Sequence, residues 1–176
     1  YIKKGILADA LRNYLLRLGW AYKDKEIFTL EESINLFDLK GVGKSPSKLD
    51  LTRILSLNEH YIKHMDEKEL FKLLKNFAQK FRKSINPSKE KAVLQSMSFL
   101  KNKAKTLDDI YCNSEYIIKD NIDILPEDKK LLDPSSKKII SEFLEMFSKI
   151  DIPNKENLEE IINNLITKHK TNFKGV

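Results

Sequence analysis

Gly43, Lys44 and Ser45, within the stretch GVGKSPSKLD at residues 41–50, are the three residue types that close a nucleotide-binding P-loop. In such a loop the backbone N–H groups surround the phosphates and the lysine reaches them. The motif also needs a glycine five residues before Gly43, and that position is Asp38, whose carboxylate would repel phosphate. We therefore expect no nucleotide site here and assign the stretch to a helix connection.

Two histidines and one cysteine are the other candidates for chemistry. His60 and His64 are four residues apart, a spacing that brings two imidazoles to one helix face and lets them share a metal ion. Tyr61 stands where a zinc-protease helix carries glutamate, and no third ligand is apparent, so solvated histidines are the favoured interpretation. Cys112 has no histidine near it in the sequence to activate it. We predict no catalytic residue and no metal site.

Lysines form the remaining pattern. Lys101, Lys103 and Lys105 in LKNKAKTL come just before an expected helix start, where the helix dipole adds positive charge and lysines can meet successive phosphates. The chain carries 32 basic and 26 acidic residues, a net charge of +6 that favours an acidic partner such as nucleic acid. The alternative is a solvated face in a lysine-rich composition.

Composition limits the class of protein. The 176 residues are 41% hydrophobic and 33% charged, which is typical of a globular chain, and five glycines with five prolines argue against a turn-rich β-fold. No apolar run approaches the roughly 18 residues of a membrane span, so we expect no membrane association. A single cysteine suits a reducing cytosol.

Apolar residues recur at helical spacing along most of the chain. Leu7, Leu11, Leu15 and Leu18 predict a first helix that ends at Gly19. Helix starts are predicted at residues able to cap a helix, sometimes with an acidic partner three positions later: Thr29 with Glu32, Asp50, Asp66 with Glu69, Asn86 before Pro87, and Thr106 with Asp109. The helix that starts at Asn86 has an apolar face of Val93, Leu94, Met97 and Leu100, so we expect it to run through Leu100. Two further helices are expected at about 135–149 and 154–168, and EYIIK at 115–119 is interpreted as a short extended piece. The predicted fold class is all-α.

We place the domain boundary at the polar joint near His64 to Asp66. It separates a small unit, residues 1–64, from a larger helical domain, residues 65–176. The chain begins at Tyr1 and ends at FKGV without a closing element, so we interpret it as part of a longer protein, incomplete at the C-terminus.

Short groups of residues follow one another in a distinctive order along the first sixty residues: Gly5, Asn13-Tyr14-Leu15, Leu18-Gly19-Trp20, Glu26-Ile27-Phe28, Ser45-Pro46, Leu49-Asp50, Leu57-Asn58 and Tyr61-Ile62. In this order they resemble the segment that follows the catalytic domain in bacterial glutamyl-tRNA synthetase. The rest of the chain matches more loosely, through KAKTLDDI and FKGV.

This resemblance implies a tRNA-binding part of a class I ligase that attaches glutamate to tRNA. Residues 1–64 would be the stem-contact region, with Lys44, Ser45, Arg53, Asn58 and Tyr61 touching tRNA. Residues 65–176 would be the anticodon-binding helical domain, with Lys101, Lys103, Lys105 and Thr106 at the anticodon. ATP and Mg²⁺ would belong to a catalytic domain whose motifs are not in this sequence, so this chain would use no cofactor. We expect it to be a cytoplasmic monomer with tRNA as its partner.

Three positions depart from the family pattern. Arg53 replaces the usual lysine, and Ser56 replaces a common tryptophan. Lys103 stands where many members have an arginine that reads the last anticodon base, and lysine lacks the planar, bidentate guanidinium. We therefore expect weaker discrimination between the tRNAs for glutamate and glutamine. The family's Gln-Pro-Leu-Arg segment, which normally follows FKGV, is absent, so the anticodon pocket would be incomplete.

The alternative from another functional class is a basic helical domain that binds proteins and has no nucleic-acid role. The two differ in salt dependence, because binding to RNA releases counterions and weakens steeply as salt rises.

Overall fold

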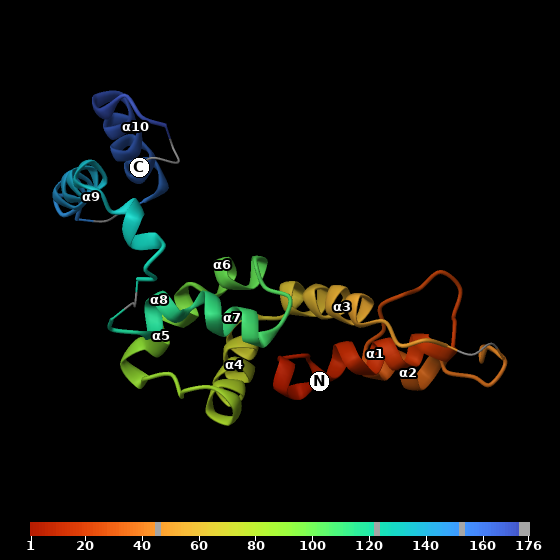
Figure 1. Cartoon of the computed structure of the whole chain (residues 1–176). Coiled ribbons are helices and arrows are strands. Elements are labelled where there is room, and N and C mark those ends of the chain that lie inside the picture. Colours follow the sequence, from red (N-terminus) through yellow and green to blue (C-terminus); the bar gives the residue numbers. More distant parts are fainter. Residues whose placement is uncertain (45–46, 122–123, 152–153, 173–176) are drawn as a thin grey trace. The chain divides into compact units, whose positions relative to one another are not determined.

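The protein is mostly helical in the part that its computed structural model describes, residues 1–44, 47–121, 124–151 and 154–172. The predicted all-α class is confirmed, and the described residues contain only one isolated antiparallel bridge, between Trp20 and Val42. Figure 1 shows the elements in order: η1 (Ile2–Lys4), α1 (Ala8–Gly19), α2 (Leu30–Leu36), α3 (Leu51–His64), α4 (Glu67–Phe81), α5 (Pro87–Gln95), α6 (Met97–Asn102), α7 (Leu107–Asn113), α8 (Glu115–Ile118), η2 (Asp128–Leu131), α9 (Pro134–Phe147) and α10 (Lys155–His169).

The helices form two compact units, residues 1–121 and 122–176. The sequence-based boundary at 64/65 lies inside the first unit, where Leu7, Ala10 and Ile62 share one buried cluster with Leu70 and Leu74 of α4. Packing therefore does not separate residues 1–64 from the helices that follow. As a division between stem-contact and anticodon-binding roles, the 64/65 boundary stays a prediction.

Capping residues begin the helices where the sequence predicts them. Thr29 and Glu32 form a reciprocal capping box at α2, and Thr106 and Asp109 form one at α7. Each pair satisfies two backbone N–H groups that have no partner within the helix. The side chains of Asp50, Asp66 and Asn86 accept from the first turns of α3, α4 and α5, and Pro87 occupies the first turn of α5.

Two local predictions are wrong. The segment EYIIK is helical, α8, because Ile117 and Ile118 pack against the main buried cluster rather than pairing with a strand. The helix expected to run from Asn86 through Leu100 breaks at Ser96, whose φ of −90° and ψ of 0° end α5 and begin α6. The break turns Met97 and Leu100 into the core alongside Val93.

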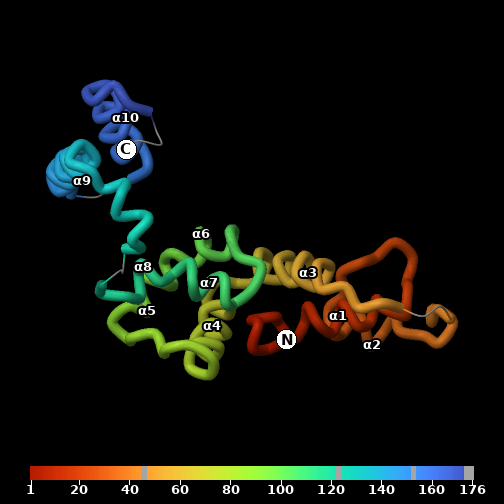
Figure 2. Tube along the Cα trace, in the orientation of Figure 1, coloured from red at the N-terminus to blue at the C-terminus, as the bar shows by residue number. Residues whose placement is uncertain are grey.

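Helices α1 and α3 lie side by side in the first unit (Figure 2) and position the residues of greatest functional interest. Ile6, Tyr14 and Ile54 form the buried centre between them. The Tyr14 hydroxyl accepts a hydrogen bond from the backbone N–H of Asp50 at 2.6 Å, which fixes the start of α3 against α1. A small core of Ile139, Ile161 and Leu165 joins α9 and α10 in the second unit.

Candidate nucleic-acid interface

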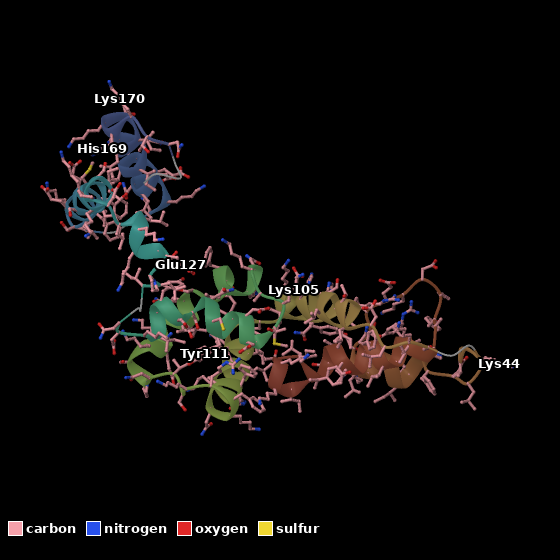
Figure 3. All side chains as sticks on the ribbon, viewed as in Figure 1. Lys44, Lys105, Tyr111, Glu127, His169 and Lys170 are labelled. Carbon is pink, nitrogen blue, oxygen red and sulfur yellow. The ribbon has the colours of Figure 1, made fainter. Side chains whose placement is uncertain are left out.

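The loop between α2 and α3 does not have the form of a nucleotide site. Helix α2 precedes it where a P-loop requires a strand, and the Asp38 carboxylate accepts from Gly41 N–H at 2.8 Å. Gly41 packs so closely on the Trp20 indole that a Cβ there would lie 2.4 Å from Nε1. Lys44 is exposed beyond this contact, at the tip of the loop (Figure 3), while Ser45 lies outside the described residues.

The surface between α1 and α3 carries two adjoining shallow hollows of about 330 and 300 Å³, which share Tyr14, Arg17 and Arg53. We call this surface the arginine groove. It is also lined by Glu26 and His60 in one hollow and by Lys48 and Asp50 in the other. Two guanidinium groups that open into one groove are well suited to phosphate, because each presents a planar fork of donors.

The charges in the groove are partly balanced. One Glu26 carboxylate oxygen lies 3.5 Å from an Arg53 terminal nitrogen and 3.9 Å from one of Arg17. The Asp50 carboxylate accepts from the backbone N–H groups of Thr52 and Arg53, so it is engaged at the start of α3. The two arginines and Lys48 therefore leave the groove with excess positive charge.

His60 lies at the edge of this groove and stacks on His64, with 4.1 Å between the ring centroids. Burial, followed by the neighbouring His64, lowers the pKa of His60, which favours its neutral form at pH 7. The described residues contain no group of three histidine, cysteine or acidic side chains placed to hold a metal ion.

Asn58 and Tyr61, both predicted from the sequence to contact RNA, make hydrogen bonds within the fold, and their contact with RNA stays a prediction. Asn58 is fully buried: its Oδ1 accepts from Leu7 N–H at 2.8 Å and its Nδ2 donates to the Lys105 carbonyl at 2.6 Å. The Asn58 side chain is therefore enclosed by protein in this structure. The half-buried Tyr61 donates its hydroxyl hydrogen to the Phe28 carbonyl at 2.9 Å, and burial raises the pKa of this hydroxyl.

The four predicted anticodon residues divide into two exposed and two engaged side chains. Lys103 and Lys105 are exposed, with the Lys103 ammonium 5.1 Å from the centre of the exposed Phe99 ring. Lys101 is only 15% exposed and donates to the Met65 carbonyl at 3.1 Å, while the buried Thr106 hydroxyl caps α7. Figure 3 shows Lys105 beside α3, well away from Lys44.

Sequence reasoning missed Arg17, Glu26 and Lys48 as members of the groove. Arg17 comes from α1, Glu26 from the following loop and Lys48 from the approach to α3, so their sequence spacing carries no sign of their proximity. The nearest signal in the sequence is Tyr14, which lies one helical turn before Arg17. Its hydroxyl accepts from Asp50 N–H, and this contact places Arg17 of α1 beside the start of α3.

Cys112 is the remaining residue that the sequence offers as a candidate for chemistry. Although Cys112 is exposed, partial desolvation and, after it, the nearby Asp108 carboxylate raise the pKa of its thiol, which favours the protonated, poorly nucleophilic form. None of the described helices combines the length and apolarity that crossing a membrane requires.

Comparison with known proteins identifies the relatives of this chain. Residues 51–176 match the family model described as an anticodon binding domain. The glutamate–tRNA ligase of Pelagibacter ubique is 57% identical over all 176 residues, and that of Bradyrhizobium diazoefficiens is 35% identical over 150 residues, 81% of the chain. The chain spans only 38% and 32% of the lengths of these two ligases.

Solved structures agree on the fold. A glutamate–tRNA ligase from Elizabethkingia meningosepticum, in complex with its amino acid, matches 98% of the chain with a TM-score of 0.78 at 24% identity, over 34% of its own length. The synthetase from Elizabethkingia anophelis matches 97% of the chain with a TM-score of 0.70 at 22% identity, over 33% of its own length. The family match over residues 51–176 and the 57% identity to a glutamate–tRNA ligase over all 176 residues place this chain in the anticodon-binding-domain family of the glutamate–tRNA ligases.

Proposed function

We propose that the chain is a tRNA-binding part of a glutamate–tRNA ligase, a cytoplasmic enzyme that attaches glutamate to tRNA using ATP. The observation that carries the proposal is the family match over residues 51–176, combined with 57% identity to a ligase over the whole chain. The chain itself contributes binding and no chemistry, so it is inactive in isolation. ATP and Mg²⁺ act in the catalytic part of the longer enzyme.

Two exposed basic surfaces in the first unit support two separate contacts with tRNA, one with the stem and one with the anticodon. Arg53, with Lys44 at the loop tip, would contact phosphates of the tRNA stem. Lys103 and Lys105, beside α3, would contact the anticodon. Lys101 and Thr106 would hold the backbone of this second surface in place. Lys101 does so by its hydrogen bond to the Met65 carbonyl, and Thr106 by capping the start of α7.

Lys103 also suggests a tRNA specificity. Its ammonium is a single point of charge, whereas a guanidinium reads a base edge through two parallel hydrogen bonds. The full-length enzyme would therefore glutamylate the tRNA for glutamine as well as the tRNA for glutamate. Equal rejection of the glutamine tRNA by this enzyme and by a Lys103→Arg variant would refute this part of the proposal.

Salt dependence tests tRNA binding by the chain. Contacts with about four phosphates predict that affinity falls about a hundredfold between about 50 and 200 mM salt. A filter-binding titration with the tRNA for glutamate measures this fall, with heparin at matched charge as a control for nonspecific attraction. The chain should bind as a monomer, with one tRNA bound per chain.

One observation favours the alternative, a protein-interaction domain. Leu30, Ile34 and Phe37 expose an apolar stripe along α2, and Leu39 just after it is 83% exposed. Such a stripe is typical of a surface that contacts another protein or another domain. Absence of tRNA binding at both salt concentrations would favour this alternative.

A further inference from the structure

The two arginines of the arginine groove share one weakly held anion. The Glu26 carboxylate oxygen is 3.5 Å from Arg53 and 3.9 Å from Arg17, both longer than the roughly 2.8 Å of a strong charge-assisted hydrogen bond. The Glu26 side chain is 66% exposed, so water competes for the same contacts. Glu26 therefore occupies the space between the guanidinium groups without tight binding to either.

The backbone beside Glu26 is fixed independently of its carboxylate. The buried Asn13 side chain donates to the Glu26 carbonyl and accepts from Phe28 N–H, both at 2.8 Å. The Glu26 carboxylate can therefore move into solvent while the backbone of residues 26–28 keeps its place.

The arginines are prepared for an anion to different degrees. The Arg17 side chain is only 21% exposed, so packing already restricts its rotamers and a ligand would order it at little entropic cost. Arg53 is 64% exposed and can adjust its guanidinium to a second oxygen. Lys48 lines the adjoining hollow and adds positive charge.

A phosphodiester offers two anionic oxygens where Glu26 offers one oxygen to both arginines. We propose that Arg17 and Arg53 form a phosphodiester site of RNA in which Glu26 is the resident anion, displaced when the phosphate binds. This inference rests on the proposed tRNA-binding function and adds Arg17 and Glu26 to it. Glu26 keeps the groove partly neutralised and so lowers its affinity for any single phosphate.

Replacing Glu26 with glutamine tests the displacement, because the amide keeps the shape and removes the competing charge. We expect Glu26→Gln to tighten binding of the tRNA for glutamate about twofold to fivefold at low salt, the range set by an exposed ion pair. Glu31→Gln is the matched control, since it removes the same charge from an exposed position on α2. The control should change affinity less than Glu26→Gln does.

Repeating the comparison in a chain without the two arginines tests whether the gain in affinity depends on them. In a chain carrying Arg17→Met and Arg53→Met, which keeps most of the apolar stems, Glu26→Gln should gain no more than Glu31→Gln. Circular dichroism of each variant reports whether it remains folded.

The outcomes separate the inference from the proposed function. If wild type binds tRNA and Arg53→Met weakens binding, but Glu26→Gln matches Glu31→Gln, the displacement is wrong and tRNA binding stands. Weaker binding by Glu26→Gln would also overturn the inference, because Glu26 would then orient the arginines. Failure of wild type to bind tRNA at low salt would overturn the proposed function itself.

Discussion

Asn58 joins three separate segments through one side-chain amide. It accepts from Leu7 N–H and donates to the carbonyls of Lys105 and, at 3.4 Å, Gly5. Gly5 has a left-handed φ of 73° and approaches α7 so closely that a Cβ would lie 2.6 Å from Asp108 N. The chain's start, the middle of α3 and the beginning of α7 are therefore held at one buried point.

Replacing Asn58 with alanine should lower the free energy of unfolding by about 2 to 4 kcal/mol, because it leaves buried backbone groups without partners and opens a cavity. Urea denaturation followed by circular dichroism measures the change. Asn76→Ala, at an exposed position on α4, is the control and should cost little. Equal stability of the Asn58 variant and wild type would show that water replaces the lost hydrogen bonds.

The sequence marks Asn58 as important without revealing why. The Leu57-Asn58 pair belongs to the family pattern, and a polar residue on a helix in an RNA-binding family suggests an RNA contact. Its burial depends on partners 47 to 53 residues away, which no local pattern reports. Arg53, by contrast, is predicted as a contact from the family resemblance, and it is exposed in the groove; its contact with tRNA stays a prediction.

At the scale of elements, the predictable features are those decided within a few residues. The capping boxes at Thr29 and Thr106 follow from two side chains three positions apart, and both are present. The break at Ser96 and the helical state of residues 115–118 depend on which apolar side chains the core accepts. Tertiary packing decided these two segments against the local pattern.

The Glu142 carboxylate of α9 binds the last two residues of α10. Glu142 accepts from His169 at 2.8 Å and lies 3.0 Å from the Lys168 ammonium. These contacts, with the His169 hydrogen bond the larger cause, lower the pKa of Glu142 from 4.5 to about 2. The pair complements the small apolar core that joins the two helices.

The lowered pKa predicts an acid-sensitive contact between α9 and α10. Because the folded pKa of Glu142 lies below its ordinary value, the ionised carboxylate stabilises the fold above about pH 4.5, and this contribution is lost as pH falls toward 2. The protection factors of the α10 amides, which correct hydrogen exchange for its intrinsic pH dependence, should therefore fall across this range. Glu142→Gln should remove most of this pH dependence.

Glu145→Gln is the matched control for that experiment, because Glu145 lies on the same helix and pairs with Lys149 instead. It should keep the acid sensitivity of the wild type. An NMR titration of Glu142 with a midpoint near 4.5 would contradict the predicted contact directly.

At the scale of the whole molecule, a net charge of +6 attracts RNA but does not say where it binds. Replacing Lys103 and Lys105 with alanine should weaken tRNA binding more than replacing Lys129 and Lys130, which are exposed on η2 in the second unit. Both double variants remove the same charge, so their difference reports location. Filter binding at one fixed salt concentration measures it, and equal losses would place the RNA surface elsewhere.

Lys101 is best left out of that comparison. Its ammonium donates to the Met65 carbonyl between α3 and α4, so its loss would disturb packing as well as charge. The sequence grouped all three lysines by spacing, whereas only burial distinguishes the engaged one.

Trp20, on whose indole Gly41 packs closely, is an intrinsic fluorescent probe of this part of the protein. Trp20 is the single tryptophan of the chain; it is 4% exposed and contacts the rings of Tyr22, Phe28 and Phe37. Its fluorescence emission therefore arises from one apolar environment at the end of α1 and reports on the loops that flank the arginine groove. A ligand that rearranges those loops can be followed by tryptophan emission without any label, and events in the second unit can be told apart because that unit contains no indole.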